Sequence, residues 1–134
     1  MDEKIFAASL NALSPFGPRY LKRALEHFGS FRNAWGAPAP EYRAIKDFSP
    51  EELTAFEREK AGMHPEVILQ ELEKNRIFLL LKEELPQGLL EPPLPPELLY
   101  VQGSLPDDLP HSLGVVGARR LSAYGKESAE KIIS

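Results

Sequence analysis

Residues 111–134 read HSLGVVGARRLSAYGKESAEKIIS, and this stretch decides which fold the C-terminal half of the chain can adopt. The run 112–117 is apolar and contains glycine, which predicts a short buried strand. The strand should end at Gly117, where the backbone has to turn sharply. A helix with Ser122 as its N-cap is expected to follow. The stretch therefore predicts a buried strand, a glycine turn and a helix start in succession.

This junction has the chemistry of a phosphate site. The free N–H groups and the dipole of the new helix would face the same point as the backbone of Gly117. Arg119 and Arg120 supply planar guanidinium groups that suit phosphate. A Rossmann-like sheet binds its ligand at such a place, beside the carboxyl end of a strand. The spacing after Gly117 does not fit the dinucleotide fingerprint, however, and arginines after a strand are as often solvated loop residues.

Working outward, two more strands are predicted upstream. RIFLLLKEE at 76–84 is a short apolar run, and ELLYVQGS at 97–104 is a second strand that ends in a turn. The proline-rich segment LPQGLLEPPLPPELL at 85–99 is interpreted as a linker or extended connection. The pattern changes near residue 76, so we predict a helical domain over residues 1–76 and the beginning of an α/β domain over residues 77–134.

The helical half begins with two amphipathic segments. Phe6, Leu10 and Leu13 are spaced to lie on one face of a helix, for which Asp2 is the expected N-cap. A second helix should begin at Pro18. Its apolar stripe is formed by Leu21, Ala24, Leu25 and Phe28. Gly29 is the expected C-terminal cap. The segment 30–36 is expected to be only a short turn.

FSPEEL predicts the next helix start, at residues 48–53. Ser49 is the N-cap, Pro50 is the first helical residue and Glu52 completes a capping box. Phe48 and Leu53 stand where a hydrophobic staple would place them. This helix should run to about residue 60, and Gly62 should stop it. A further helix is expected over 64–75, again with proline at its first position.

The first helix pair has the outline of a helix-hairpin-helix module, in LNALSPFGPRYLKRALEHFG at 10–29. Such modules hold a phosphate with backbone N–H groups at the turn and at the second helix start. A secondary DNA contact would then involve Gly17, Arg19, Lys22 and Arg23. Pro18 removes one of the N–H donors, and we favour an ordinary helical bundle whose turn is only a turn.

Composition narrows the function classes. The chain has 134 residues, a formal net charge of −4 and no cysteine, so disulfides and cysteine metal sites are excluded. No apolar run could span a bilayer, and the acidic N-terminus is unlike a signal peptide, so we expect a cytoplasmic protein without membrane contact. His27, His64 and His111 lack metal-ligand spacing, and no cofactor is expected. Ser122 has no evident base, which favours capping over nucleophilic catalysis.

Two blocks of the C-terminal half resemble the DNA processing protein DprA (Smf) family. They are PPELLYVQGSL at 95–105 and LGVVGARRLSAYGKESAEKI at 113–132, with the spacing of that family. The helical half resembles the family's sterile-alpha-motif-like (SAM-like) or helix-hairpin-helix domain. The resemblance implies single-stranded DNA binding and loading of the RecA recombinase in natural transformation, with no catalysis. It also allows a homodimer in the full-length protein.

The resemblance also implies a set of site residues. Gly117 and Arg119 match the Gly-x-Arg of the family's DNA pocket, with Arg120 beside them. Ser122, Tyr124 and Gly125 match the Ser-x-Tyr-Gly that opens the next helix. The expected fold is thus a mostly α-helical N-terminal domain followed by the start of an α/β Rossmann-like domain.

This sequence departs from the family pattern at three places. Ala118 stands where serine or threonine is usual, and Leu85 precedes Pro86 where the family has Tyr-Pro. The α/β domain reaches only its first strand and helix, so we expect a fragment of a longer protein. Two alternatives stay open: a nucleotide-binding Rossmann-like enzyme or sensor, and a helical protein-interaction module. Tyr20 and Trp35 could stack on bases, but their helical context favours a place in the core.

Overall fold

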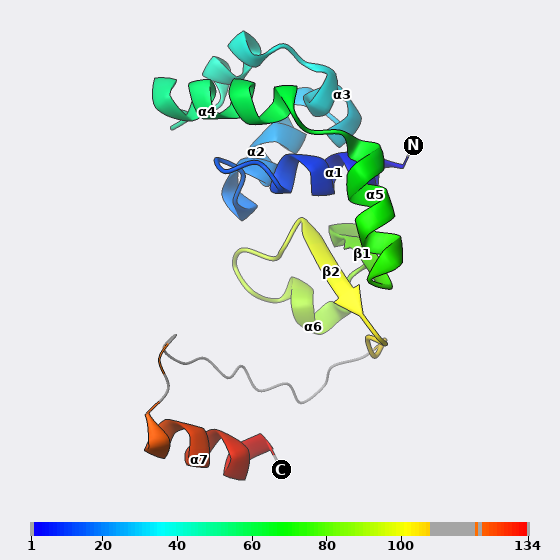
Figure 1. The fold of residues 1–134 in the computed structure, drawn as a ribbon, viewed down its shortest axis with the longest axis vertical. Helices are drawn as coiled ribbons and strands as arrows, with labels where there is room; N and C mark the ends of the chain where they lie inside the picture. The colour runs from blue at the N-terminus through cyan, green and yellow to red at the C-terminus, as the bar shows by residue number, and fades with distance from the viewer. Residues whose placement is uncertain (1, 108–119, 121, 134) are drawn as a thin grey trace.

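The computed structural model describes residues 2–107, 120 and 122–133 (Figure 1). Helices α1 to α5 gather at the N-terminal end of the molecule, and the strand pair packs below α1 and α5. The elements are α1 Glu3–Asn11, α2 Pro18–Phe28, α3 Phe31–Gly36, η1 Ala39–Ala44, α4 Pro50–Ala61, α5 Pro65–Lys74, β1 Ile77–Leu81, η2 Lys82–Glu84, α6 Gln87–Leu90, β2 Leu98–Gln102 and α7 Ala123–Ile133.

The predicted starts of α1 and α2 are confirmed, with one correction. Pro18 is the first residue of α2, and Gly29 ends it with a φ of 78°, a backbone conformation that glycine adopts without strain. Leu10 is buried in α1, and Leu21 is buried in α2. Asp2 lies at the N-cap position of α1, but its side chain accepts no capping hydrogen bond. The predicted N-cap position of Asp2 is therefore correct, but the prediction that its side chain caps the helix is wrong.

The segment expected to be a short turn forms helix α3. Ser30 caps it, because its Oγ accepts a hydrogen bond from the N–H of Asn33 at 3.0 Å. Glu3 in α1 supplies a second cap, since its carboxylate accepts from the N–H of Phe31 at 2.7 Å. Phe31 and Ala34 are buried, which gives this one-and-a-half-turn helix the tertiary packing that its length requires.

The capping box of α4 is confirmed. The Ser49 Oγ accepts from the N–H of Glu52 at 3.1 Å, and the Glu52 carboxylate accepts from the N–H of Ser49 at 2.7 Å. The helix ends at Ala61, before Gly62, and α5 then starts at Pro65 as predicted. These starts depend on neighbours within three residues, which explains why local sequence predicts them.

Strands β1 and β2 form an antiparallel pair in which Ile77 lies opposite Gln102 and Leu81 lies opposite Leu98. The predicted strand at 76–84 ends earlier than expected, because residues 82–84 form the 3-10 turn η2. The proline-rich connection contains the short helix α6 and the start of β2. The strand predicted at 112–117 lies outside the described residues.

The hydrophobic core lies between α1, α2, η1 and α4, and aromatic rings fill much of it. The ring of Phe56 stands 4.4 Å from that of Tyr42 and 5.6 Å from that of Phe16, measured between centroids. Leu79 of β1 and Leu98 of β2 belong to the same buried cluster. The strand pair thus shares its inner face with the helices. Among the residues that the structure describes, no helix combines the length and apolar character needed to cross a bilayer.

Candidate nucleic-acid interface

The start of α7 carries the part of the predicted phosphate site that the structure describes. The Ser122 Oγ accepts a hydrogen bond from the N–H of Gly125 at 3.0 Å, and the Ser122 carbonyl accepts from the N–H of Lys126 at 3.0 Å. The predicted capping role of Ser122 is thereby confirmed. A Cβ at Gly125 would approach the Ser122 Oγ to 3.2 Å, closer than most such contacts, so glycine leaves room for the cap.

Two further site residues are exposed beside this cap. Arg120 makes no hydrogen bond or ion pair with another described residue, and Tyr124 is 80% exposed. The first turn of α7 contains no acidic side chain. The described part of this surface therefore combines a helix N-terminus, a guanidinium group and an aromatic ring without an opposing carboxylate. Gly117 and Arg119 lie outside the described residues.

The turn of the predicted helix-hairpin-helix is occupied by a carboxylate. Glu59 of α4 accepts from the Ser14 backbone N–H and from the Ser14 hydroxyl, both at 2.7 Å. The Asn11 side chain donates to the carbonyl of Phe16 at 3.0 Å. A phosphate approaching the N–H of Ser14 would have to displace a group of its own charge. This geometry favours the interpretation of the turn as part of a helical bundle.

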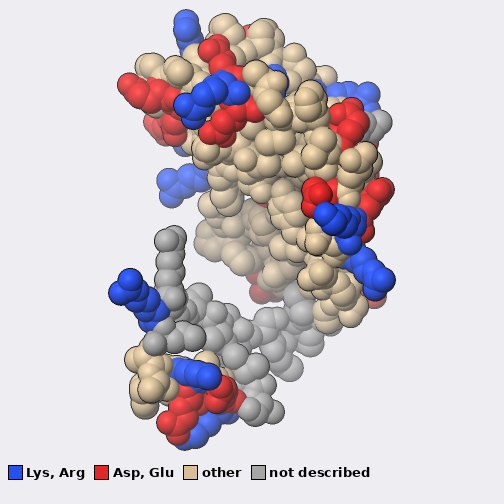
Figure 2. Space-filling model, in the orientation of Figure 1, with Lys and Arg blue, Asp and Glu red and all other residues tan. Residues whose placement is uncertain are grey.

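The basic side chains that follow Gly17 differ in their surroundings. Arg23 donates to the Lys46 carbonyl at 2.6 Å and forms an ion pair with Asp47 at 3.1 Å. Lys22 lies 3.9 Å from Glu26, which makes a looser ion pair. Arg19 is exposed and has no partner within the described ranges. On the face drawn in Figure 2, lysine and arginine are mixed with aspartate and glutamate over the helical part, without a continuous basic stripe.

The two aromatic residues considered for base stacking are packed into the protein. The Tyr20 hydroxyl donates to the Asp47 carbonyl at 2.5 Å, and its ring meets that of Phe48 edge-on at 5.2 Å. Trp35 packs against the core, and the Lys60 Nζ stands 5.5 Å from its ring centroid. Burial lowers the pKa of Lys60. Both aromatic residues therefore serve packing, as their helical context predicts.

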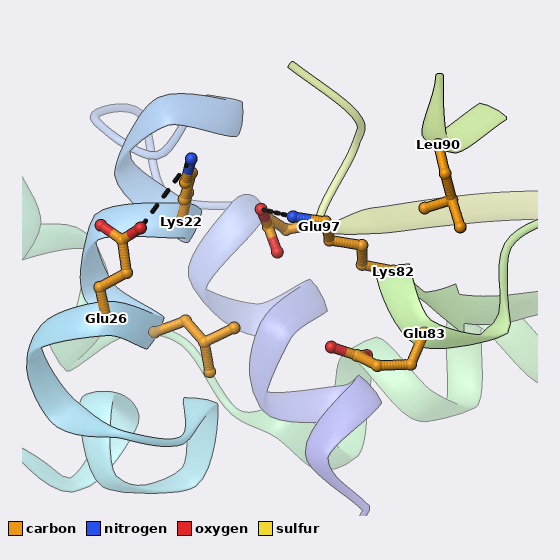
Figure 3. Close-up of a pocket in the computed structure, with 7 residues that line it drawn as sticks. Lys22, Glu26, Lys82, Glu83, Leu90 and Glu97 are labelled. Carbon is orange, nitrogen blue, oxygen red and sulfur yellow. Dashed lines mark hydrogen bonds and ion pairs between the residues drawn. The ribbon is translucent and has the colours of Figure 1, made fainter. Parts of the chain in front are cut away.

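An open cleft of about 400 Å³ lies between α2 and the segment from η2 to β2 (Figure 3). Its charged lining comes from Lys22, Glu26, Lys82, Glu83 and Glu97. Glu97 is only 5% exposed and pairs with Lys82 at 3.3 Å. Carboxylates outnumber ammonium groups here, so the cleft does not favour phosphate. Sequence patterns give no signal for it, because Lys82 and Glu97 are fifteen residues apart and meet only through the strand pairing.

The described residues contain no group of three or more histidine, cysteine, aspartate or glutamate side chains that could hold a metal ion. His27 lies in the last turn of α2 and His64 lies just before α5. His111 falls outside the described residues. The described part of the chain therefore offers no candidate metal centre.

Three glutamates that link separate elements have pKa values below the ordinary value of 4.5. The N–H of Ser49 lowers the pKa of Glu52, and the N–H of Ser14 lowers the pKa of Glu59. The ammonium of Lys4, at 2.6 Å, lowers the pKa of Glu84. Each carboxylate is held more tightly when it is ionised than when it is protonated.

These shifts predict that acid destabilises the fold. A lowered folded-state pKa contributes stability that is complete above the unfolded pKa and is lost as the pH falls through the folded value. The urea midpoint should therefore be lower at pH 3 than at pH 6.5. Glu59→Gln should narrow this difference, whereas Glu57→Gln should not, since Glu57 is exposed and makes no hydrogen bond or ion pair with another described residue. Equal midpoints at the two pH values would contradict the prediction.

Comparison with known proteins gives a family match for the C-terminal part of the chain. Residues 76–134, from the residue before β1 to the end of the chain, match the family model described as DNA recombination-mediator protein A. This match and the relative described next support the resemblance to the DprA (Smf) family that the sequence motifs predict.

A particular relative is Protein Smf of Synechocystis sp. (strain ATCC 27184 / PCC 6803 / Kazusa). It is 28% identical over 137 residues, an alignment that covers 97% of this chain and 34% of the relative. The chain therefore spans about a third of the length of that protein. The helical half, which the family model does not cover, is included in this alignment. No solved structure matches the chain.

Proposed function

We propose that this chain contributes to DNA recombination by binding single-stranded DNA, without catalysis, around residues 117–125. The observation that carries the proposal is the match of residues 76–134 to a DNA recombination-mediator family. The structure supports the proposal because the first turn of α7 contains no acidic side chain and its Tyr124 is exposed. The binding residues would be Gly117, Arg119, Arg120, Ser122, Tyr124 and Gly125.

The proposed mechanism is a phosphate clamp. Backbone N–H groups at Gly117 and at the helix start would donate hydrogen bonds to the anion, and the helix dipole would favour its charge. Arg119 and Arg120 would add charge-assisted hydrogen bonds to phosphate oxygens. Such contacts carry no base information, so binding should not depend on sequence. In the longer protein this site would belong to a Rossmann-like domain beginning near residue 77, and the bound strand would be passed to RecA in the cytoplasm.

A second function is proposed for residues 1–76, as a protein-interaction module. The contact of Glu59 with Ser14 favours it, because a carboxylate already occupies the turn where a helix-hairpin-helix would hold phosphate. The mixture of acidic and basic side chains on this part is also more typical of a protein contact than of a nucleic-acid surface. Gly17, Arg19, Lys22 and Arg23 would then contribute at most a secondary DNA contact.

The test is a titration of the 134-residue chain with fluorescent oligonucleotides at low and moderate salt. We expect binding that prefers a single strand to a duplex, that ignores base sequence and that weakens with salt. Excess ATP should compete poorly, which separates this function from mononucleotide binding. Absence of single-strand binding at low salt, or preference for the mononucleotide, would contradict the proposal for this chain.

Arg119→Ala tests whether Arg119 belongs to the phosphate clamp. We expect at least about a tenfold loss of single-strand affinity, since a charge-assisted hydrogen bond contributes on the order of 1.5–3 kcal/mol. The slope of log affinity against log salt should fall by about 0.7, because one phosphate contact is lost. Arg43→Ala removes the same charge from an exposed position in η1 and should change neither quantity. Equal affinities of the two variants would contradict the assignment of Arg119.

A further inference from the structure

The cleft between α2 and the segment from η2 to β2 has a buried carboxylate in its wall. The Glu97 side chain is only 5% exposed, and one of its oxygens lies 3.3 Å from the Lys82 Nζ. This distance exceeds the separation of about 2.7–2.9 Å that is usual between an ammonium and a carboxylate. No other described residue forms a hydrogen bond or ion pair with Glu97. The charge of this buried carboxylate is therefore only partly compensated.

The second oxygen of Glu97 is open to the cleft. Among the described residues that are not exposed, every side-chain nitrogen or oxygen closed off from solvent has a hydrogen-bond partner. The second oxygen of Glu97 has no partner among them, so it keeps contact with solvent, and Glu97 lines the cleft. A further donor at this oxygen would be favourable, because a buried polar group costs free energy until it is hydrogen-bonded.

The charges of the lining indicate that this donor should be a cation. Figure 3 shows Glu97 between Glu26 on the α2 side and Glu83 on the η2 side, and both of these glutamates are exposed. The three carboxylates are accompanied by two ammonium groups, those of Lys22 and Lys82, so the lining has a formal charge of −1. One additional cation in the cleft would balance this charge.

The apolar part of the lining favours arginine as the source of the cation. Leu25 and Leu90 add apolar surface beside the carboxylates. An arginine side chain has an apolar stem, which would lie against these leucines, and a planar guanidinium whose donors can serve two acceptors at once. A lysine would add only a second point charge of the kind that Lys82 already supplies. The volume of about 400 Å³ is also within the range of roughly 300–1,000 Å³ that is usual for ligand pockets.

We infer that this cleft binds an arginine side chain of a partner protein. The guanidinium would donate to the free oxygen of Glu97, with the carboxylates of Glu26 and Glu83 at the rim. A protein partner fits better than free arginine, whose own carboxylate would meet this acidic rim. The inference goes beyond the proposed function, which places DNA at the start of α7 and names no contact surface on the helices. It does not depend on DNA binding.

The inference is tested with the full 134-residue chain and the blocked peptide acetyl-Gly-Arg-Gly-amide, followed by backbone amide shifts in two-dimensional NMR spectra. We expect a Kd on the order of 1 mM, with the largest shifts in residues 22–26, 82–83 and 97–98. Citrulline has the shape of arginine without its charge, and the citrulline peptide should bind at least about tenfold more weakly. The lysine peptide and free arginine should also bind more weakly than the arginine peptide.

Variants of the lining assign the binding to the cleft. Glu97→Gln should weaken binding of the arginine peptide at least about tenfold, because it removes the buried charge. Glu83→Gln should weaken it about twofold to fivefold, as expected for an exposed ion pair. Glu83 makes no hydrogen bond or ion pair with another described residue, so this variant decides the question if Glu97→Gln does not fold. Glu57→Gln removes the same charge from an exposed position on α4 and should change nothing.

Lys82→Met should act in the opposite direction. It removes the cation that competes for Glu97, so the arginine peptide should bind at least about threefold more tightly. A carboxylate with a purely structural role would not give this gain, which makes Lys82→Met the sharpest of the variants.

Several results would overturn the inference. They are equal affinities for the arginine and citrulline peptides, no loss of affinity in Glu83→Gln and Glu97→Gln relative to Glu57→Gln, and no shifts at about 50 mM peptide, far above the expected Kd. Tighter binding of free arginine than of the peptide would contradict a protein partner. Oligonucleotide binding by the same samples is measured separately, so the proposed function and this inference can fail independently of each other.

Discussion

Phe56→Ala is expected to lower the free energy of unfolding by about 3–5 kcal/mol, the usual cost of removing a buried phenylalanine ring. The Phe56 side chain is completely buried at the centre of the aromatic cluster. Its ring centroid lies 4.4 Å from that of Tyr42, 5.6 Å from that of Phe16 and 6.2 Å from that of Phe48. Rigid rings cannot close the cavity that alanine would leave, so the upper half of the range is expected.

Urea denaturation followed by far-ultraviolet circular dichroism measures this effect. Phe78→Ala is the matched control, since Phe78 is 42% exposed on β1 and should cost less than about 1 kcal/mol, as surface substitutions usually do. A domain with typical stability of about 5–15 kcal/mol should remain folded but shift its midpoint clearly. Similar midpoints for the two variants would contradict the position of Phe56 in the core.

Lys82→Met is expected to cost about 2 kcal/mol, because it leaves the Glu97 carboxylate buried without its cation. The two side chains lie 3.3 Å apart, and Glu97 is 5% exposed. Methionine keeps most of the apolar stem of lysine, so the loss reports on charge rather than on packing. The cost stays below that of a fully buried pair, since the Lys82 side chain is 34% exposed.

Two further variants isolate the charge effect. Lys74→Met breaks an exposed ion pair with Glu71, 3.5 Å long with side chains 74% and 60% exposed, and should cost less than about 0.5 kcal/mol. The double variant Lys82→Met, Glu97→Leu replaces both charges by apolar groups and should recover most of the stability. A Lys82→Met cost no larger than that of Lys74→Met, measured by the same urea unfolding, would show that Glu97 is hydrated in solution.

The aromatic cluster and the contact of Glu59 also bear on where DNA could bind. The cluster uses the aromatic residues of α2, η1 and α4 for packing, and the Glu59 carboxylate occupies the donors of the first turn. The helical part is thereby left with mixed charges and packed rings. The start of α7 has an exposed ring, and Arg120, which precedes the helix, has no partner among the described residues. This contrast is why the proposed function places single-strand binding at α7 and a protein contact on the helices.

The family and the local helix signals could be read from the sequence alone. The Gly-x-Arg and Ser-x-Tyr-Gly motifs at 117–125 point to the family that the comparisons identify. Pro18, Ser49 and Pro65 predict helix starts correctly, because capping and proline geometry involve residues only a few positions apart. The cap of α7 by Ser122 follows from the same local chemistry.

Tertiary structure decided the features that join distant positions. Helix α3 forms where a turn was predicted, because Glu3, twenty-eight residues earlier, caps it and the core covers Phe31. Glu59 reaches Ser14 across forty-five positions, and that contact changes the meaning of a hairpin whose sequence suggests phosphate binding. Pairing of β1 with β2 brings Lys82 to Glu97. Such contacts depend on which surfaces the packed chain brings together, and no short sequence window contains both partners.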